Sequence, residues 1–101
     1  LRQMTAHPDL VLGGPTVQWF AAAMEECAEL ATSASPDVPC LTFLGDREEI
    51  VATPAIHDRM ARWPNGRLES VAQAQHEILI ERPEIRAPVM DAIAAHFTRA
   101  E

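Results

Sequence analysis

Hydrophobic residues recur at helical spacing in the first part of the chain. Pro15 and Thr16 follow the turn residues Gly13 and Gly14, so a helix is predicted to begin here with Thr16 as its N-cap. The helix is expected to extend for about 17 residues. Its apolar stripe steps by three or four positions through Val17, Phe20, Met24, Cys27 and Ala31.

The second part of the chain begins after a linker, residues 33–39, rich in Ser, Pro and Asp. Residues 40–44 form a short, nearly continuous apolar run, which is typical of a parallel strand buried on both faces. Thr53 and Pro54 are expected to start a helix, with Thr53 as its cap. Pro64, Asn65 and Gly66 end this helix and turn the chain.

A second strand and a final helix complete the pattern. Residues 67–71 are predicted to be the strand, and Pro83 and Pro88 are expected to bracket a bend before a helix that starts at Pro88. Residues 39–99 therefore follow the order strand, helix, strand, helix, which predicts the α/β class, a parallel sheet and right-handed crossovers. Because two strands form no stable sheet alone, we expect a larger fold or an assembly.

The charge and the cysteine content of the chain indicate which partners and cofactors are not expected. The chain has 15 acidic and 8 basic side chains, a formal charge of −7. Nucleic-acid binding requires clusters of Lys and Arg, so this composition argues against a nucleic-acid partner. Cys27 and Cys40 are predicted to be buried, reduced thiols. Neither CxxC nor HxxxH occurs, so no metal ion is expected, and nothing indicates an organic cofactor.

Polar side chains follow both predicted strands, at the sheet edge where α/β proteins build their sites. Asp46, Glu48 and Glu49 follow the first strand, and His76 follows the second. A carboxylate that accepts a hydrogen bond from an imidazole N–H fixes its tautomer and stabilises the imidazolium. The pattern thus allows a carboxylate–histidine pair at this edge, and it leaves open the alternative of a loop histidine with ordinary hydrogen bonds.

Three segments resemble one family. Residues 44–51, Leu-Gly-Asp-Arg-Glu-Glu-Ile-Val, resemble the acid-bearing loop of α/β-hydrolases. Residues 74–79, Ala-Gln-His-Glu-Ile-Leu, together with Glu81, resemble the histidine loop of bacterial lysophospholipases and their monoglyceride-lipase relatives. Residues 13–16 with Trp19 resemble part of the lysophospholipase cap. The resemblance implies the C-terminal portion of an α/β-hydrolase fold, with its last parallel strands and helices, plus part of the helical cap.

By this resemblance, Glu48 is the acid of a catalytic triad and His76 is its general base, with Asp46 and Glu49 as competing acids. The acid precedes the histidine, as in the family. The family's nucleophile is a serine in an upstream G-x-S-x-G turn, and the serines of this chain lie in no such motif. Together with a first residue, Leu1, that is not Met, this leads us to expect a serine ester hydrolase segment that is inactive alone.

The resemblance also implies domain limits, substrate and partners. Residues 1–37 would be the end of the helical cap with its linker, and residues 38–101 the last part of the hydrolase core. The substrate would be a monoacylated lipid or other small ester, and the rest of the hydrolase chain would be a partner. The expected location is the cytoplasm, with transient contact with a membrane surface. Expected substrate-lining residues are Trp19, Phe20 and Val51.

A second interpretation is a non-enzymatic interaction module. A small acidic α/β chain could complete its sheet by forming a dimer with a second copy. The short length and the missing nucleophile favour this interpretation, whereas the motifs in the two strand-end loops favour the hydrolase. The sequence leaves the oligomeric state open.

Overall fold

The structure is a computed structural model that describes residues 5–99. The chain divides into two compact units, Leu1–Ser33 and Ala34–Glu101. The first unit holds the short 3₁₀ helix η1 (Pro8–Leu10) and the helix α2 (Val17–Thr32). Thr16 is the N-cap of α2, and its Oγ1 accepts a hydrogen bond from the backbone N–H of Trp19 at 3.0 Å. The predicted helix and its cap are therefore confirmed.

The apolar stripe of α2 is exposed. Phe20 is 59% exposed and Met24 is 54% exposed, so neither side chain packs into a core within its own unit. Cys27 on this helix is also exposed, and Cys40 in the second unit is half-buried. The prediction of two buried thiols is wrong, because Cys27 lies on a helix whose described residues are mostly exposed and Cys40 is the first residue of its strand.

The second unit has the predicted order of strands and helices. β1 (Cys40–Gly45) leads to α3 (Thr53–Ala61), and β2 (Gly66–Val71) leads through the 3₁₀ helix η2 (Ile78–Ile80) to α4 (Pro83–Arg99). The two strands pair in parallel, in a register that sets Cys40 opposite Gly66 and Gly45 opposite Val71. The parallel sheet predicted from the apolar runs is confirmed, and each strand extends one residue beyond its expected limits.

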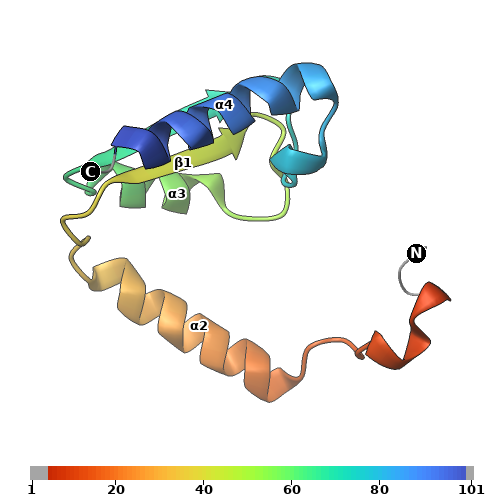
Figure 1. Cartoon of the computed structure of the whole chain (residues 1–101). Helices are drawn as coiled ribbons and strands as arrows, with labels where there is room; N and C mark the ends of the chain where they lie inside the picture. The colour runs from red at the N-terminus through yellow and green to blue at the C-terminus, as the bar shows by residue number, and fades with distance from the viewer. Residues whose placement is uncertain (1–4, 100–101) are drawn as a thin grey trace. The chain divides into compact units, whose positions relative to one another are not determined.

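Helices α3 and α4 cover opposite faces of this sheet (Figure 1). Side chains alternate between the faces of a strand. Thr42 of β1 points to α3, where its hydroxyl donates to the Sδ of Met60 at 3.2 Å. Leu41 and Phe43 point the other way and line a hollow with Ile93 of α4. The sheet is thus a thin layer with one helix on each face.

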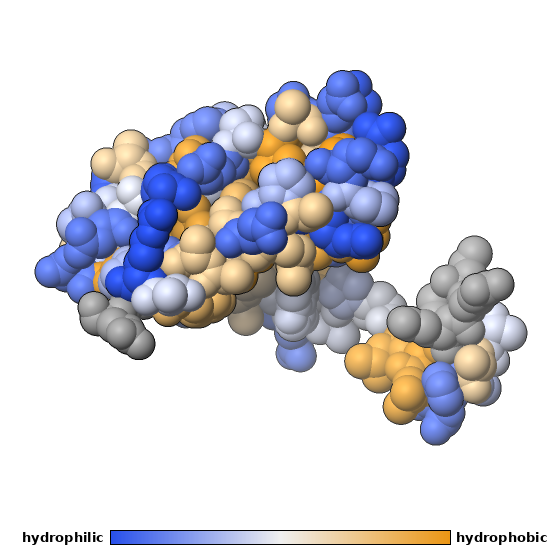
Figure 2. Space-filling view, turned by 45° about the horizontal axis from the view of Figure 1, so that its top comes forward, coloured by the Kyte–Doolittle hydropathy of each residue, from blue (hydrophilic) through white to orange (hydrophobic). Residues whose placement is uncertain are grey.

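The core of the described residues is small. Four hydrophobic side chains are buried, Leu44, Met60, Ala74 and Val89. Many larger apolar side chains remain exposed, and Figure 2 shows hydrophobic surface interleaved with polar side chains. β1 was expected to be buried on both faces, but most of it is half-buried. Such a small two-stranded unit is compatible with a partial α/β fold, since sheets of this size are marginal by themselves.

Two helix starts differ from the sequence prediction. Ala52, and not Thr53, is the N-cap of α3, and no side chain caps that end. α4 begins at Pro83 and continues through Pro88, so the predicted bend is wrong. Pro88 removes one backbone donor from the helix. The adjacent Val89 is only 4% exposed, so the helix is packed at this point.

Candidate active site

The carboxyl ends of the two strands bring the two candidate loops together. Gly45, the last residue of β1, is the register partner of Val71, the last residue of β2. The loop with Glu48 and the loop with His76 therefore leave the sheet side by side. Arg47 lies in the first of these loops, and its backbone N–H donates to the carbonyl of Ala74 in the second at 2.9 Å. This sheet edge is the place where α/β proteins build their sites.

Glu48 and His76 form a hydrogen-bonded pair at this edge. The Glu48 Oε2 lies 2.8 Å from the His76 Nδ1. The other oxygen, Oε1, accepts hydrogen bonds from the backbone N–H groups of Ile50 at 2.7 Å and Val51 at 3.0 Å. The Glu48 side chain is 4% exposed and that of His76 is 41% exposed. The acid is therefore fixed in position, and the imidazole remains accessible to another molecule.

The contacts of Glu48 favour its ionised form. Desolvation raises the pKa of this carboxyl, but hydrogen bonds from Val51, Ile50 and His76 outweigh it, so the pKa lies below its ordinary value. An ionised Glu48 accepts the N–H of His76 at Nδ1. The neutral imidazole then presents Nε2 as its proton acceptor. The pair has the geometry of a general base with its orienting acid.

Asp46 and Glu49, the two alternative candidates for the triad acid, lie in other surroundings. The Asp46 Oδ1 accepts a hydrogen bond from the backbone N–H of Gln73 at 2.7 Å. Glu49 is exposed and lines a surface hollow. Of these three carboxylates, the structure therefore brings Glu48 to the imidazole of His76. The catalytic roles of the pair remain predictions.

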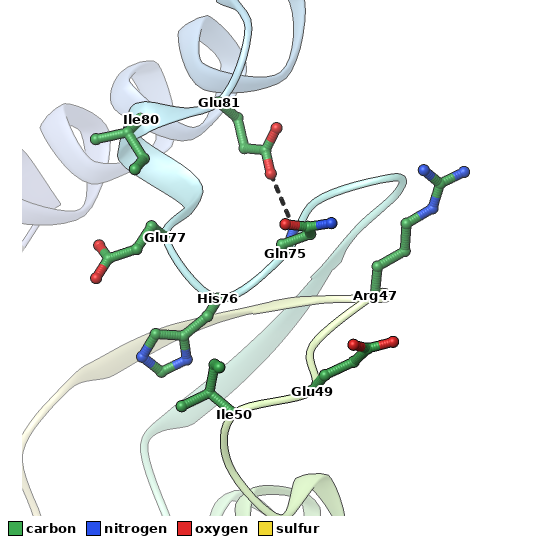
Figure 3. A pocket seen from close by; sticks show the side chains of 8 residues that line it. All are labelled: Arg47, Glu49, Ile50, Gln75, His76, Glu77, Ile80 and Glu81. Atoms are coloured by element: carbon green, nitrogen blue, oxygen red, sulfur yellow. Dashed lines mark hydrogen bonds between the residues drawn. The ribbon is translucent and has the colours of Figure 1, made fainter. Parts of the chain in front are cut away.

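An open hollow of about 630 Å³ lies beside His76. Figure 3 shows that the His76 imidazole and Ile50 border it, with Arg47 and Glu49 on the first loop and Gln75 on the second. Charged and polar side chains form much of its lining. The complete lining is Arg47, Glu49, Ile50, Gln75, His76, Glu77, Ile80 and Glu81. A ligand in this hollow would be in reach of the imidazole.

The three residues predicted to line the substrate site lie in different places. Trp19 and Phe20 are on α2 in the first unit, and they are 60% and 59% exposed. Val51 follows Glu48 in the second unit, and its backbone N–H donates to the acid. A substrate contact of any of these side chains remains a prediction.

Glu81 has a function that the sequence did not reveal. The resemblance places Glu81 with the histidine loop and says nothing of its contacts, but Glu81 is half-buried and its Oε1 accepts the backbone N–H of Gln75 at 3.0 Å (Figure 3). The available signal was a carboxylate close to a turn, since Asp and Glu in loops often accept backbone N–H groups. Which N–H it meets depends on the fold of the loop.

Neither a metal site nor a membrane-spanning helix is found in residues 5–99. No three side chains of His, Cys, Asp or Glu gather there in a way that could hold a metal ion. In the same part of the chain, no helix is both long and apolar enough to cross a bilayer.

The chain is similar to lysophospholipases over most of its length. It is 28% identical over 96 residues to the probable lysophospholipase L2 of Haemophilus influenzae and 28% identical over 107 residues to lysophospholipase L2 of Escherichia coli K12. These matches cover 94% and 98% of this chain, but 30% and 32% of the two relatives. The predicted resemblance to bacterial lysophospholipases is thus confirmed, and the chain spans about a third of the length of the curated relatives it matches.

Two other comparisons gave no match. No protein family profile matches the chain, and no solved structure matches it.

Gly45 allows the two loops to approach each other. A Cβ at this position would overlap the carbonyl oxygen of Ala74 and lie 2.6 Å from that of Gln75. Both are backbone atoms of the loop that carries His76. We expect Gly45→Ala to lower the free energy of unfolding by about 1–3 kcal/mol, measured by urea denaturation. Gly14→Ala is the control, because a Cβ there meets nothing within 4 Å. Equal stability of the two variants would contradict this close approach.

Proposed function

We propose that this chain supplies the acid and the histidine of a serine ester hydrolase whose nucleophile lies in a preceding segment. One observation carries the proposal: the Glu48 carboxylate, held by two backbone N–H groups, accepts the Nδ1–H of His76 at the edge of a parallel sheet. The similarity to lysophospholipases supports the same reaction class. We infer that the chain corresponds to the C-terminal part of such an enzyme.

The proposed reaction uses His76 as a proton carrier. The Nε2 of His76 removes the proton of the serine hydroxyl as the oxygen attacks the acyl carbonyl, and the imidazolium then protonates the departing alcohol. In the second step, His76 removes a proton from water as the water attacks the acyl carbonyl. The ester bond to the serine then breaks, the imidazolium returns the proton to the serine oxygen, and the carboxylic acid leaves. The negative charge of Glu48 stabilises the imidazolium in both steps. No metal ion or organic cofactor takes part in this chemistry.

The proposed substrate is a monoacylated lipid ester. The curated relatives are lysophospholipases by name. On α2, the exposed aromatic side chains of Trp19 and Phe20 are suited to contact an acyl chain or a lipid surface. In this proposal, residues 1–37 belong to the helical cap and residues 38–101 to the core. The rest of the hydrolase chain is the partner that completes the sheet.

A fluorophosphonate probe tests the presence of an activated serine. We expect the probe to label the full-length protein that contains this chain, because His76 raises the nucleophilicity of the serine. The 101-residue chain alone should remain unlabelled, since the serines within it lie outside any nucleophile motif. The measurement is in-gel fluorescence followed by mass spectrometry of the labelled peptide. Absence of labelling in an active full-length protein would contradict the serine mechanism.

A non-enzymatic interaction module remains the second candidate. Each of the two paired strands has one open edge, and several apolar side chains are exposed in the described residues, so a second copy could complete the sheet. A full-length protein that neither reacts with the probe nor hydrolyses esters, but forms a stable dimer, would favour this alternative.

A further inference from the structure

The segment that carries His76 has little regular structure of its own. Residues 72–77 lie between β2 and η2, outside any helix or strand. A catalytic histidine must nevertheless hold its position closely, because a displacement of about 1 Å can cost about 100-fold in rate. Contacts that fix the backbone on its N-terminal side can therefore add to the hydrogen bond with Glu48 in setting the position of His76.

Two carboxylates hold that backbone. The Asp46 Oδ1 accepts the N–H of Gln73 at 2.7 Å, and the Glu81 Oε1 accepts the N–H of Gln75 at 3.0 Å. Asp46 precedes this segment in the sequence and lies in the loop after β1. Glu81 follows the segment and lies just before α4. Hydrogen bonds from N–H groups to carboxylates are about twice as strong as those between neutral groups.

The backbone between the two carboxylates is in a conformation that needs such support. The N–H of Ala74 donates to the carbonyl of Val71 at 3.4 Å, and Gln73 has a φ of 63°. This is the third position of a turn, where a positive φ favours Gly or Asn over Gln. The side chain of Gln73 also accepts a hydrogen bond from Arg82 at 3.1 Å. The turn is therefore held from both of its neighbouring segments.

The two contacts also connect His76 to Glu48. Asp46 is two residues before Glu48 in the same loop. The hydrogen bond between Asp46 and Gln73 therefore connects the loop of Glu48 to the loop of His76. Ala74, between the two held residues, is fully buried and accepts the N–H of Arg47. We propose that Asp46 and Glu81 are positioning residues, which hold the His76 segment in register with Glu48 without taking part in the reaction. This inference rests on the proposed function.

Alanine and amide variants of the full-length protein test this proposal. Asp46→Ala and Glu81→Ala remove the acceptor oxygen, so each should lower kcat by about 10- to 100-fold while KM changes little. Asp46→Asn and Glu81→Gln keep an oxygen that can accept the same N–H, so each should retain most of kcat. Glu84→Ala, at an exposed position of α4, is the control and should behave as the wild type. A loss as large in the amide variants as in the alanine variants would overturn the proposal, because the retained acceptor oxygen would then contribute nothing to the position of His76.

A second measurement does not depend on hydrolysis. In the alanine variants, backbone hydrogen exchange at Gln73 for Asp46→Ala, and at Gln75 for Glu81→Ala, should become about 10-fold faster or more. The Nδ1–H signal of His76 in proton NMR should broaden in the same variants. Unchanged exchange and an unchanged imidazole signal would overturn the positioning role. If exchange increases but the wild-type protein hydrolyses no ester, the proposed function fails and the structural inference stands.

Discussion

Replacement of His76 with Ala should abolish ester hydrolysis by the full-length protein, with a loss in kcat/KM of about 10⁴-fold or more. The imidazole can take a proton from a hydroxyl nucleophile, and its Nδ1 already lies 2.8 Å from the Glu48 carboxylate. In the proposed mechanism, loss of the imidazole would leave the serine proton without an acceptor and the departing alcohol without a donor. The measurement is initial-rate hydrolysis of a monoacylated lipid ester and of a short soluble ester.

His57→Ala is the matched control for this experiment. His57 lies on α3 at an exposed position. Its replacement should leave hydrolysis unchanged. The circular dichroism spectrum of each variant should match that of the wild type, so that a loss of activity cannot be assigned to unfolding. Full activity of the His76→Ala protein would remove His76 from the mechanism.

Much of the second unit could be predicted from local patterns. The apolar run at residues 40–44 was short and was followed by Gly45, which is typical of a buried parallel strand, and β1 occupies Cys40–Gly45. The prediction of the parallel pair required only that a helix lie between two strands. These features depend on which residues are apolar and how they are spaced, and both are explicit in a sequence.

Features that depend on packing were predicted less well. Pro88 was expected to mark a bend, but α4 continues through it although proline has no backbone N–H to donate, and the adjacent Val89 is buried. The stripe on α2 was found correctly, although its side chains remain exposed in the unit that contains them. Periodicity indicates which face of a helix is apolar, but it does not show what covers that face.

The sequence was sufficient to predict which residues form the candidate site. It was less informative about the hydrogen bonds that hold these residues in place. The order of strands places the loops of Glu48 and His76 at one edge, and the two side chains meet there. No sequence pattern indicates directly that Asp46 and Glu81 accept backbone N–H groups. Those contacts depend on the turn at Gln73, whose positive φ is not favoured by its residue type. The family resemblance indicated that Glu48 is the acid that faces the histidine. The hydrogen bond between Glu48 and His76 has the geometry expected for such a pair.

Replacement of Glu48 with Gln should lower kcat of the full-length protein by about 10²- to 10⁴-fold with little change in KM. The Gln oxygen can still accept the N–H groups of Ile50 and Val51, so the loop should keep its shape. Its amide NH₂ would then face the Nδ1 of His76 and donate to it. The neutral imidazole would carry its proton on Nε2, where it cannot accept the proton of the nucleophile.

The dependence of stability on pH provides an independent check on Glu48. Because its pKa lies below the ordinary value of 4.5, the ionised carboxylate stabilises the fold above that value, and this contribution is lost as the pH falls through the lowered pKa. The Glu48→Gln protein lacks this contribution, so its free energy of unfolding should approach that of the wild type as the pH falls through the lowered pKa. Glu84→Gln, at an exposed position of α4, should keep the wild-type rate. If the Glu48→Gln protein hydrolysed esters at the wild-type rate, Glu48 would have no part in orienting His76. Its hydrogen bonds with the backbone of Ile50 and Val51 would then only stabilise the loop.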